Sequence, residues 1–138
     1  MINIINMQDI RYLNLFNKIT NVNTRFCFKY NEVIGFSVPK ELVSKAIGEG
    51  GRNIKRMSEI LGKRIKVISA PRGLYDIRKF MESVVSPTTF KDLEFDAKEI
   101  IITAGSQSKA ALIGRDKRRL HELQKISKDF FDRDLRIV

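Results

Sequence analysis

The chain has 138 residues, of which 43% are hydrophobic and 30% are charged, and its formal net charge at pH 7 is +10. This composition is that of an ordinary folded protein and excludes a disordered chain. The sequence shows neither a signal peptide nor an apolar run long enough to cross a bilayer, so we expect a cytoplasmic protein with no membrane partner.

Each half of the chain begins with a segment that has the pattern of an amphipathic helix. In both segments four apolar residues follow the i, i+3, i+4, i+7 spacing that places them on one helix face. The quartets are Tyr12, Leu15, Phe16 and Ile19 in the first half and, 65 residues later, Ile77, Phe80, Met81 and Val84 in the second. The shared spacing predicts that the chain contains an internal repeat.

The elements that follow these helices also occur twice. Alternating or β-branched runs predict two strands per half, followed by a short helix, a longer amphipathic helix and a short closing strand. The expected ranges are 26–30, 33–38, 40–47, 54–61 and 65–68 in the first half, and 90–95, 99–103, 106–113, 120–130 and 135–138 in the second. The sequence therefore predicts an α+β fold in which the order α-β-β-α-α-β occurs twice.

A glycine motif lies between the two consecutive helices of each half. Residues 47–54 read I-G-E-G-G-R-N-I and residues 113–120 read I-G-R-D-K-R-R-L. A helix that ends at a glycine and restarts after a short turn exposes backbone N–H groups and the positive end of the second helix, which attract phosphate. A helix C-cap accounts for Gly48 but not for the pair Gly50 and Gly51, which we interpret as room for phosphate against the backbone.

The element order and the first motif resemble the type II KH module, an RNA-binding fold whose glycine loop clamps a short single strand by its backbone. Two such modules, linked by residues 70–73, resemble the archaeal NusA-like transcription factors over nearly the whole chain. The resemblance implies tandem α+β modules, each with a three-stranded sheet covered by helices. They are residues 1–72, with a full GxxG loop at 48–51, and residues 73–138, with a degenerate GxxK loop at 114–117.

The resemblance also implies a function, that of a non-enzymatic protein which binds single-stranded RNA during transcription elongation or termination. Its expected partners are the nascent transcript and RNA polymerase, with no cofactor and no metal. The expected RNA contacts lie in the two loops and beside them. They are Lys45, Gly48, Glu49, Gly50, Gly51, Arg52, Lys55 and Arg56 in the first module, and Gly114, Arg115, Asp116, Lys117, Arg118 and Arg119 in the second.

The positive charge lies mainly in the first half of the chain. Residues 1–72 contain 13 Lys and Arg against 5 Asp and Glu, a net charge of +8, whereas residues 73–138 contain 13 against 11, a net charge of +2. We therefore expect polyanion binding to centre on the first module, with the Glu49 carboxylate pointing away from the RNA. Lys117 replaces a glycine of the family pattern, which predicts a hindered backbone approach. The second loop then either grips phosphate through side chains or serves mainly in packing.

Other functions fit the sequence less well. The stretch that begins at Gly62 lacks the serine or threonine of a Walker loop, and Asn53 stands where a dinucleotide fingerprint needs a third glycine. His121 is the single histidine and Cys27 the single cysteine, so metal, disulfide and nucleophilic chemistry have no support. Two alternatives remain open: an RNA-binding protein of ribosome assembly or RNA processing, and a protein-interaction adaptor with vestigial loops.

Overall fold

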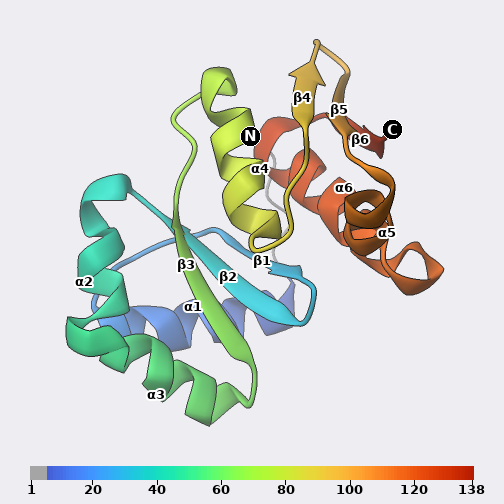
Figure 1. The fold of residues 1–138 in the computed structure, drawn as a ribbon. Helices are drawn as coiled ribbons and strands as arrows, with labels where there is room; N and C mark the ends of the chain where they lie inside the picture. Colours follow the sequence, from blue (N-terminus) through green and yellow to red (C-terminus); the bar gives the residue numbers. More distant parts are fainter. Residues whose placement is uncertain (1–5) are drawn as a thin grey trace. The chain divides into compact units, whose positions relative to one another are not determined.

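A computed structural model of the chain describes residues 6–138, so the first five residues of the predicted first module lie outside the described part. The chain divides into two compact units between Pro71 and Arg72 (Figure 1). Each unit contains α-helices and one three-stranded sheet, so the fold class is α+β, as predicted. Among the described residues, no helix combines the length and apolar character needed to span a membrane.

The first unit has the predicted element order. Its elements are α1 (Met7–Thr20), β1 (Cys27–Tyr30), β2 (Val33–Val38), α2 (Val43–Ile47), α3 (Arg52–Leu61) and β3 (Arg64–Ser69). The strands pair in the order β1-β2-β3, with β1 antiparallel and β3 parallel to the central β2. A 3-10 turn at Lys40–Leu42 leads into α2, and another at Glu49–Gly51 joins α2 to α3.

The core of the first unit lies between its sheet and its helices. Ile34, Phe36 and Val38 of β2 share one face of the sheet, because alternate residues of a strand point to the same side, and all three are buried. The ring of Phe36 stacks on that of Phe16 in α1, with the ring centroids 4.3 Å apart. Met57 of α3 belongs to the same buried cluster. The predicted apolar face of α1 thus supplies the core, whereas α3 contributes Met57 and leaves Ile60 of its predicted face 55% exposed.

The strand β1 begins one residue later than the alternation predicted. The Phe26 carbonyl still accepts a hydrogen bond from the Ser37 N–H at 3.0 Å. The Phe26 N–H, however, donates to the Thr24 hydroxyl at 3.2 Å. Because a nearby side chain takes up this N–H, the regular ladder starts at Cys27.

The second unit repeats the order α-β-β-α-α-β. Its elements are α4 (Ile77–Val85), β4 (Asp92–Phe95), β5 (Glu99–Thr103), α5 (Ser106–Ile113), α6 (Arg118–Phe131) and β6 (Asp134–Ile137). The strands pair in the order β4-β5-β6, with β4 antiparallel and β6 parallel to β5. The pairing pattern is therefore the same as that of β1, β2 and β3.

The core of the second unit is built on the predicted face of α4, whose four apolar residues are all buried. The Phe80 ring of α4 lies against those of Phe130 and Phe131 in α6, with centroid distances of 4.7 and 5.6 Å. Ile100 and Leu135, paired on the neighbouring strands β5 and β6, are also buried. The same spacing of apolar residues thus produces the same kind of core in both units.

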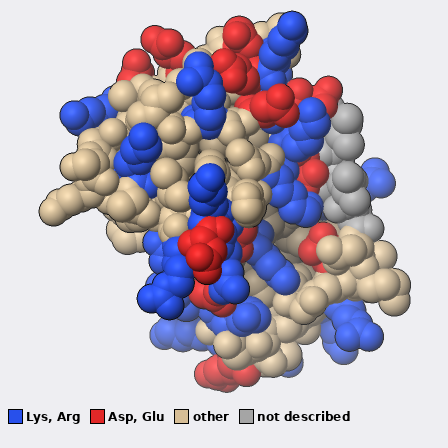
Figure 2. Space-filling view, turned by 90° about the vertical axis from the view of Figure 1, so that its right-hand side faces the viewer, with Lys and Arg blue, Asp and Glu red and all other residues tan. Residues whose placement is uncertain are grey.

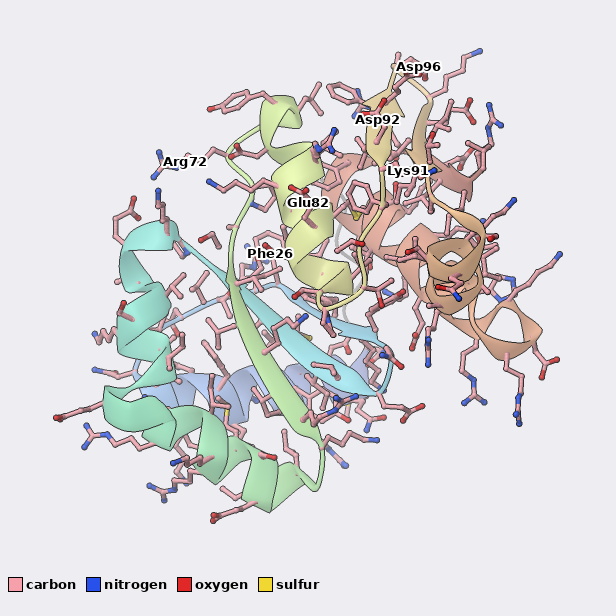
Figure 3. The ribbon with its side chains drawn as sticks, in the orientation of Figure 1. Phe26, Arg72, Glu82, Lys91, Asp92 and Asp96 are labelled. Carbon is pink, nitrogen blue, oxygen red and sulfur yellow. The ribbon has the colours of Figure 1, made fainter. Side chains whose placement is uncertain are left out.

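One charged side chain of α4, that of Arg78, reaches the edge strand of the second sheet. Arg78 Nη1 of α4 donates to the Asp92 carboxylate of β4 at 2.9 Å, and Arg78 Nε lies 3.8 Å from the Glu82 carboxylate. Glu82 and Asp92 project from these two elements in Figure 3. At the β4–β5 turn the Asp96 carboxylate accepts two backbone hydrogen bonds, at 2.7 and 2.9 Å, which lower the pKa of Asp96.

Truncating a stacked core ring tests this account of the first unit. Phe36→Ala should lower the free energy of unfolding by about 3–5 kcal/mol, because it removes a buried ring and leaves a cavity. Tyr75→Ala, which truncates a side chain that is 79% exposed, should change it by less than about 0.5 kcal/mol. Urea denaturation of both variants measures the difference. Equal effects would contradict the placement of Phe36 in the core.

Candidate nucleic-acid interface

The loop at residues 48–51 turns the chain from α2 into α3 with three glycines at positive φ. Gly48 ends α2 by donating its N–H to the Ser44 carbonyl at 3.0 Å, and has φ 80° and ψ 164°. Gly50 (φ 63°, ψ 17°) and Gly51 (φ 75°, ψ 19°) follow in the left-handed region. The Gly51 N–H donates to the Gly48 carbonyl at 3.0 Å, and α3 begins at the next residue.

The three glycines serve different purposes. A Cβ atom added to Gly50 or Gly51 would meet nothing within 4 Å, so both positions face open space. Positive φ is what favours glycine there, and the absence of a side chain leaves the backbone approachable. A Cβ atom on Gly48 would lie only 2.9 Å from Cγ of Asn53. A side chain at Gly48 would therefore have to displace the Asn53 amide, in addition to adopting positive φ.

The loop at residues 114–117 follows the same backbone path without the glycine pair. Gly114 has φ 74° and ψ 174°, Asp116 has φ 56° and ψ 27°, and Lys117 has φ 59° and ψ 23°. Lys117 therefore leaves the path of the backbone unchanged. What differs is that two side chains project from the positions that are open at Gly50 and Gly51. The predicted hindrance to a ligand would thus come from these side chains and not from an altered turn.

The first loop is surrounded by basic side chains. Lys45 on α2, and Arg52, Lys55 and Arg56 on α3, are all exposed, and none forms a salt bridge with another described residue. Glu49 is exposed as well. The α3 helix also directs the positive end of its dipole toward the loop. The local field at the loop therefore favours an anion, with one carboxylate opposing it.

The second loop has a different distribution of charge. Arg115, Lys117 and Arg118 are exposed, as is Asp116. Arg119 is half-buried, and its Nη1 donates to the Ala111 carbonyl of α5 at 2.8 Å. The Arg119 guanidinium is thus engaged with a backbone carbonyl of its own unit. On the face drawn in Figure 2, acidic and basic side chains are interspersed.

Sequence reasoning did not assign a role to Asn53, which the structure places beside the first loop. Its Nδ2 donates to the carbonyls of Lys45 and Ala46, at 3.3 and 3.2 Å. Asn53 and Arg119 stand at equivalent positions of the two motifs, five residues after the first glycine of each. Aligning the two halves residue by residue would have paired them, although nothing in their types suggests a shared role.

The chain is similar in sequence to known proteins. Residues 33–82 match the KH domain family, and the match runs from β2 through both helices, the first loop and β3 into α4. A protein of Methanocaldococcus jannaschii named probable transcription termination protein NusA is 29% identical over 125 residues, covering 88% of this chain and 67% of that protein. The protein of the same name from Methanococcus vannielii is 30% identical over 89 residues, covering 64% of this chain and 50% of that protein.

A solved structure described as the crystal structure of APE1850 has a similar fold. The TM-score is 0.65 at 24% sequence identity, over 97% of this chain and 99% of that one. The first loop lies within the residues that match the KH domain family. Together with the two NusA relatives, the KH match supports the resemblance drawn from the sequence, that of an archaeal NusA-like KH protein. It spans about two thirds of one relative and half of the other.

Exchanging glycine and lysine between the two loops tests the conformational account. Lys117→Gly should raise the free energy of unfolding by about 1 kcal/mol, because glycine adopts positive φ without the cost borne by an L side chain. Gly51→Lys should lower it by a similar amount at the equivalent position. Chemical denaturation of the two variants provides the measurement. If Lys117→Gly were destabilising, the left-handed conformation at that position would be wrong.

Proposed function

We propose that the chain binds single-stranded RNA through the loop at residues 48–51, as a non-enzymatic protein of transcription elongation or termination. The observation that carries the proposal is the Gly50-Gly51 pair. Both residues are left-handed, both face open space, and α3 begins immediately after them. The exposed cationic side chains around the loop supply the charge that a polyanion requires.

The chemistry of binding follows from the start of α3. The first N–H groups of a helix have no partner within the helix and can bind a phosphate oxygen that comes close enough. Since the N–H groups of Gly51 and Arg52 donate to the Gly48 and Glu49 carbonyls of the turn, we propose the N–H groups that follow them in the first turn of α3 for this contact. Gly50 and Gly51 permit that approach because neither carries a side chain. Arg52, Lys55 and Arg56 then neutralise further phosphates along the strand. Such contacts hold the backbone of the RNA and leave its bases available for recognition elsewhere.

We further propose that residues 1–72 and 73–138 are tandem type II KH modules. The support is that both units have the order α-β-β-α-α-β and the same combination of one antiparallel and one parallel strand pair. In the second module we propose a weaker phosphate grip, made by the side chains of Arg115, Lys117 and Arg118. Asp116 opposes that grip, and the net charge of this half is only +2.

The part in transcription rests on the two relatives, whose names describe probable transcription termination proteins. On that basis we propose the nascent transcript as the RNA that is bound, with RNA polymerase as a further partner. The KH match supports RNA binding whichever process the chain serves.

Placing negative charge in the first loop tests the proposed RNA contact. A variant with Glu49→Asp and Gly50→Asp should lose single-stranded RNA binding in a gel-shift titration, because a carboxylate at the open position repels phosphate. Its thermal unfolding should change little, since Asp116 adopts nearly the same φ and ψ in the second loop. Aspartate is therefore compatible with this backbone conformation.

The matched control combines Glu49→Asp with Gly50→Asn, which adds a side chain of nearly the same size at position 50 without the charge. Asparagine also tolerates the left-handed region, so this variant should fold like the aspartate variant. We expect it to bind RNA more weakly than the wild type but more strongly than the aspartate variant. Wild-type affinity in the aspartate variant would rule out this loop as the RNA contact.

A further inference from the structure

The end of α2 and the start of α3 are joined by a side chain across the first loop. The last carbonyls of a helix have no partner within it, and those of Lys45 and Ala46 lie in the final turn of α2. Asn53, the second residue of α3, donates Nδ2 to both carbonyls, at 3.3 and 3.2 Å. The Asn53 side chain, which belongs to α3, therefore supplies hydrogen bonds to carbonyl groups at the end of α2.

The second loop has the same connection made by a different side chain. Arg119 is the second residue of α6, and its Nη1 donates to the Ala111 carbonyl in the last turn of α5 at 2.8 Å. Both donor and acceptor are shifted by 66 residues relative to Asn53 and Lys45. The position is thus used in the same way twice, once by a short amide and once by a long guanidinium group.

In both units this side chain also covers the first glycine of the loop. A Cβ atom on Gly48 would approach Cγ of Asn53 to 2.9 Å, and one on Gly114 would approach Cγ of Arg119 to 2.8 Å. The bridging side chain therefore contacts the loop at its first residue as well as the preceding helix. These contacts restrict how the two helices and the intervening turn can move relative to one another within each unit.

We propose that Asn53 and Arg119 are positioning residues that hold each loop in its RNA-binding geometry before RNA is bound. This inference rests on the RNA-binding function proposed above. Fixing the turn fixes the direction of the N–H groups at the start of α3. Because the loop is already ordered, binding does not have to order it, and the affinity is higher for that reason. Arg119 acts on RNA through the loop, whereas Arg115, Lys117 and Arg118 would meet phosphate directly.

The substitution Asn53→Ala in the full chain tests the inference. NMR order parameters of the backbone amides at residues 49–52, measured without RNA, should fall from the range of rigid backbone, about 0.85, toward that of flexible loops, below about 0.6. Affinity for a short single-stranded RNA should fall about three- to tenfold. Asn14→Ala, an exposed asparagine on α1, is the matched control and should change neither quantity.

Two further variants make the result decisive. Asn53→Arg copies the second unit and should keep the loop ordered, whereas Arg119→Met should loosen residues 115–118. If Asn53→Ala fails to fold, Asn53→Asp, which keeps the size and loses the amide donor, gives the same order-parameter readout. An ordered loop in these donor-free variants, or a loosened loop with wild-type affinity, would overturn the inference. If the wild type bound no RNA, the proposed function would fail, and the order parameters would still decide whether Asn53 fixes the loop.

Discussion

The proposed RNA interface depends on one conformational constraint, two consecutive left-handed residues between the end of α2 and the start of α3. This turn places the start of α3 directly after α2, with the N–H groups of Gly51 and Arg52 donated to the Gly48 and Glu49 carbonyls of the turn. Left-handed conformations cost an L side chain roughly 1–2 kcal/mol per residue, and glycine avoids that cost. Because Gly50 and Gly51 have no side chain, they adopt the left-handed conformation at little cost. For the same reason, they leave the backbone of the loop uncovered.

The second loop has the left-handed backbone conformation without the uncovered backbone. Asp116 and Lys117 adopt the left-handed conformation, so the turn forms, but their side chains occupy the space that is open in the first loop. The net charge of the two halves of the chain differs as well, since residues 1–72 carry +8 and residues 73–138 carry +2. The first loop therefore combines an approachable backbone with a place in the more positive half of the chain. The second loop keeps the backbone geometry without the open positions.

Much of the fold could be predicted from the sequence because it is set by apolar periodicity. The quartets that begin at Tyr12 and Ile77 predicted the buried faces of α1 and α4, and residues 33–38 and 99–103 were predicted as strands with the correct bounds. The backbone path of the second loop was not predicted. Glycine is favoured at positive φ but is not required there, and Asp116 and Lys117 adopt this conformation. The role of Asn53 was missed because its hydrogen bonds cross a loop, and a pattern of residue types does not show such contacts.

The most direct test of the account is to observe which backbone amides respond to RNA. Titrating the full chain with a four-nucleotide single-stranded RNA, and following the amide resonances by NMR, reports on both loops in one experiment. The account predicts that the largest changes fall on residues 49–52 and the start of α3, with smaller changes at residues 115–118. Changes concentrated on the second loop, or on the sheets with neither loop affected, would contradict it.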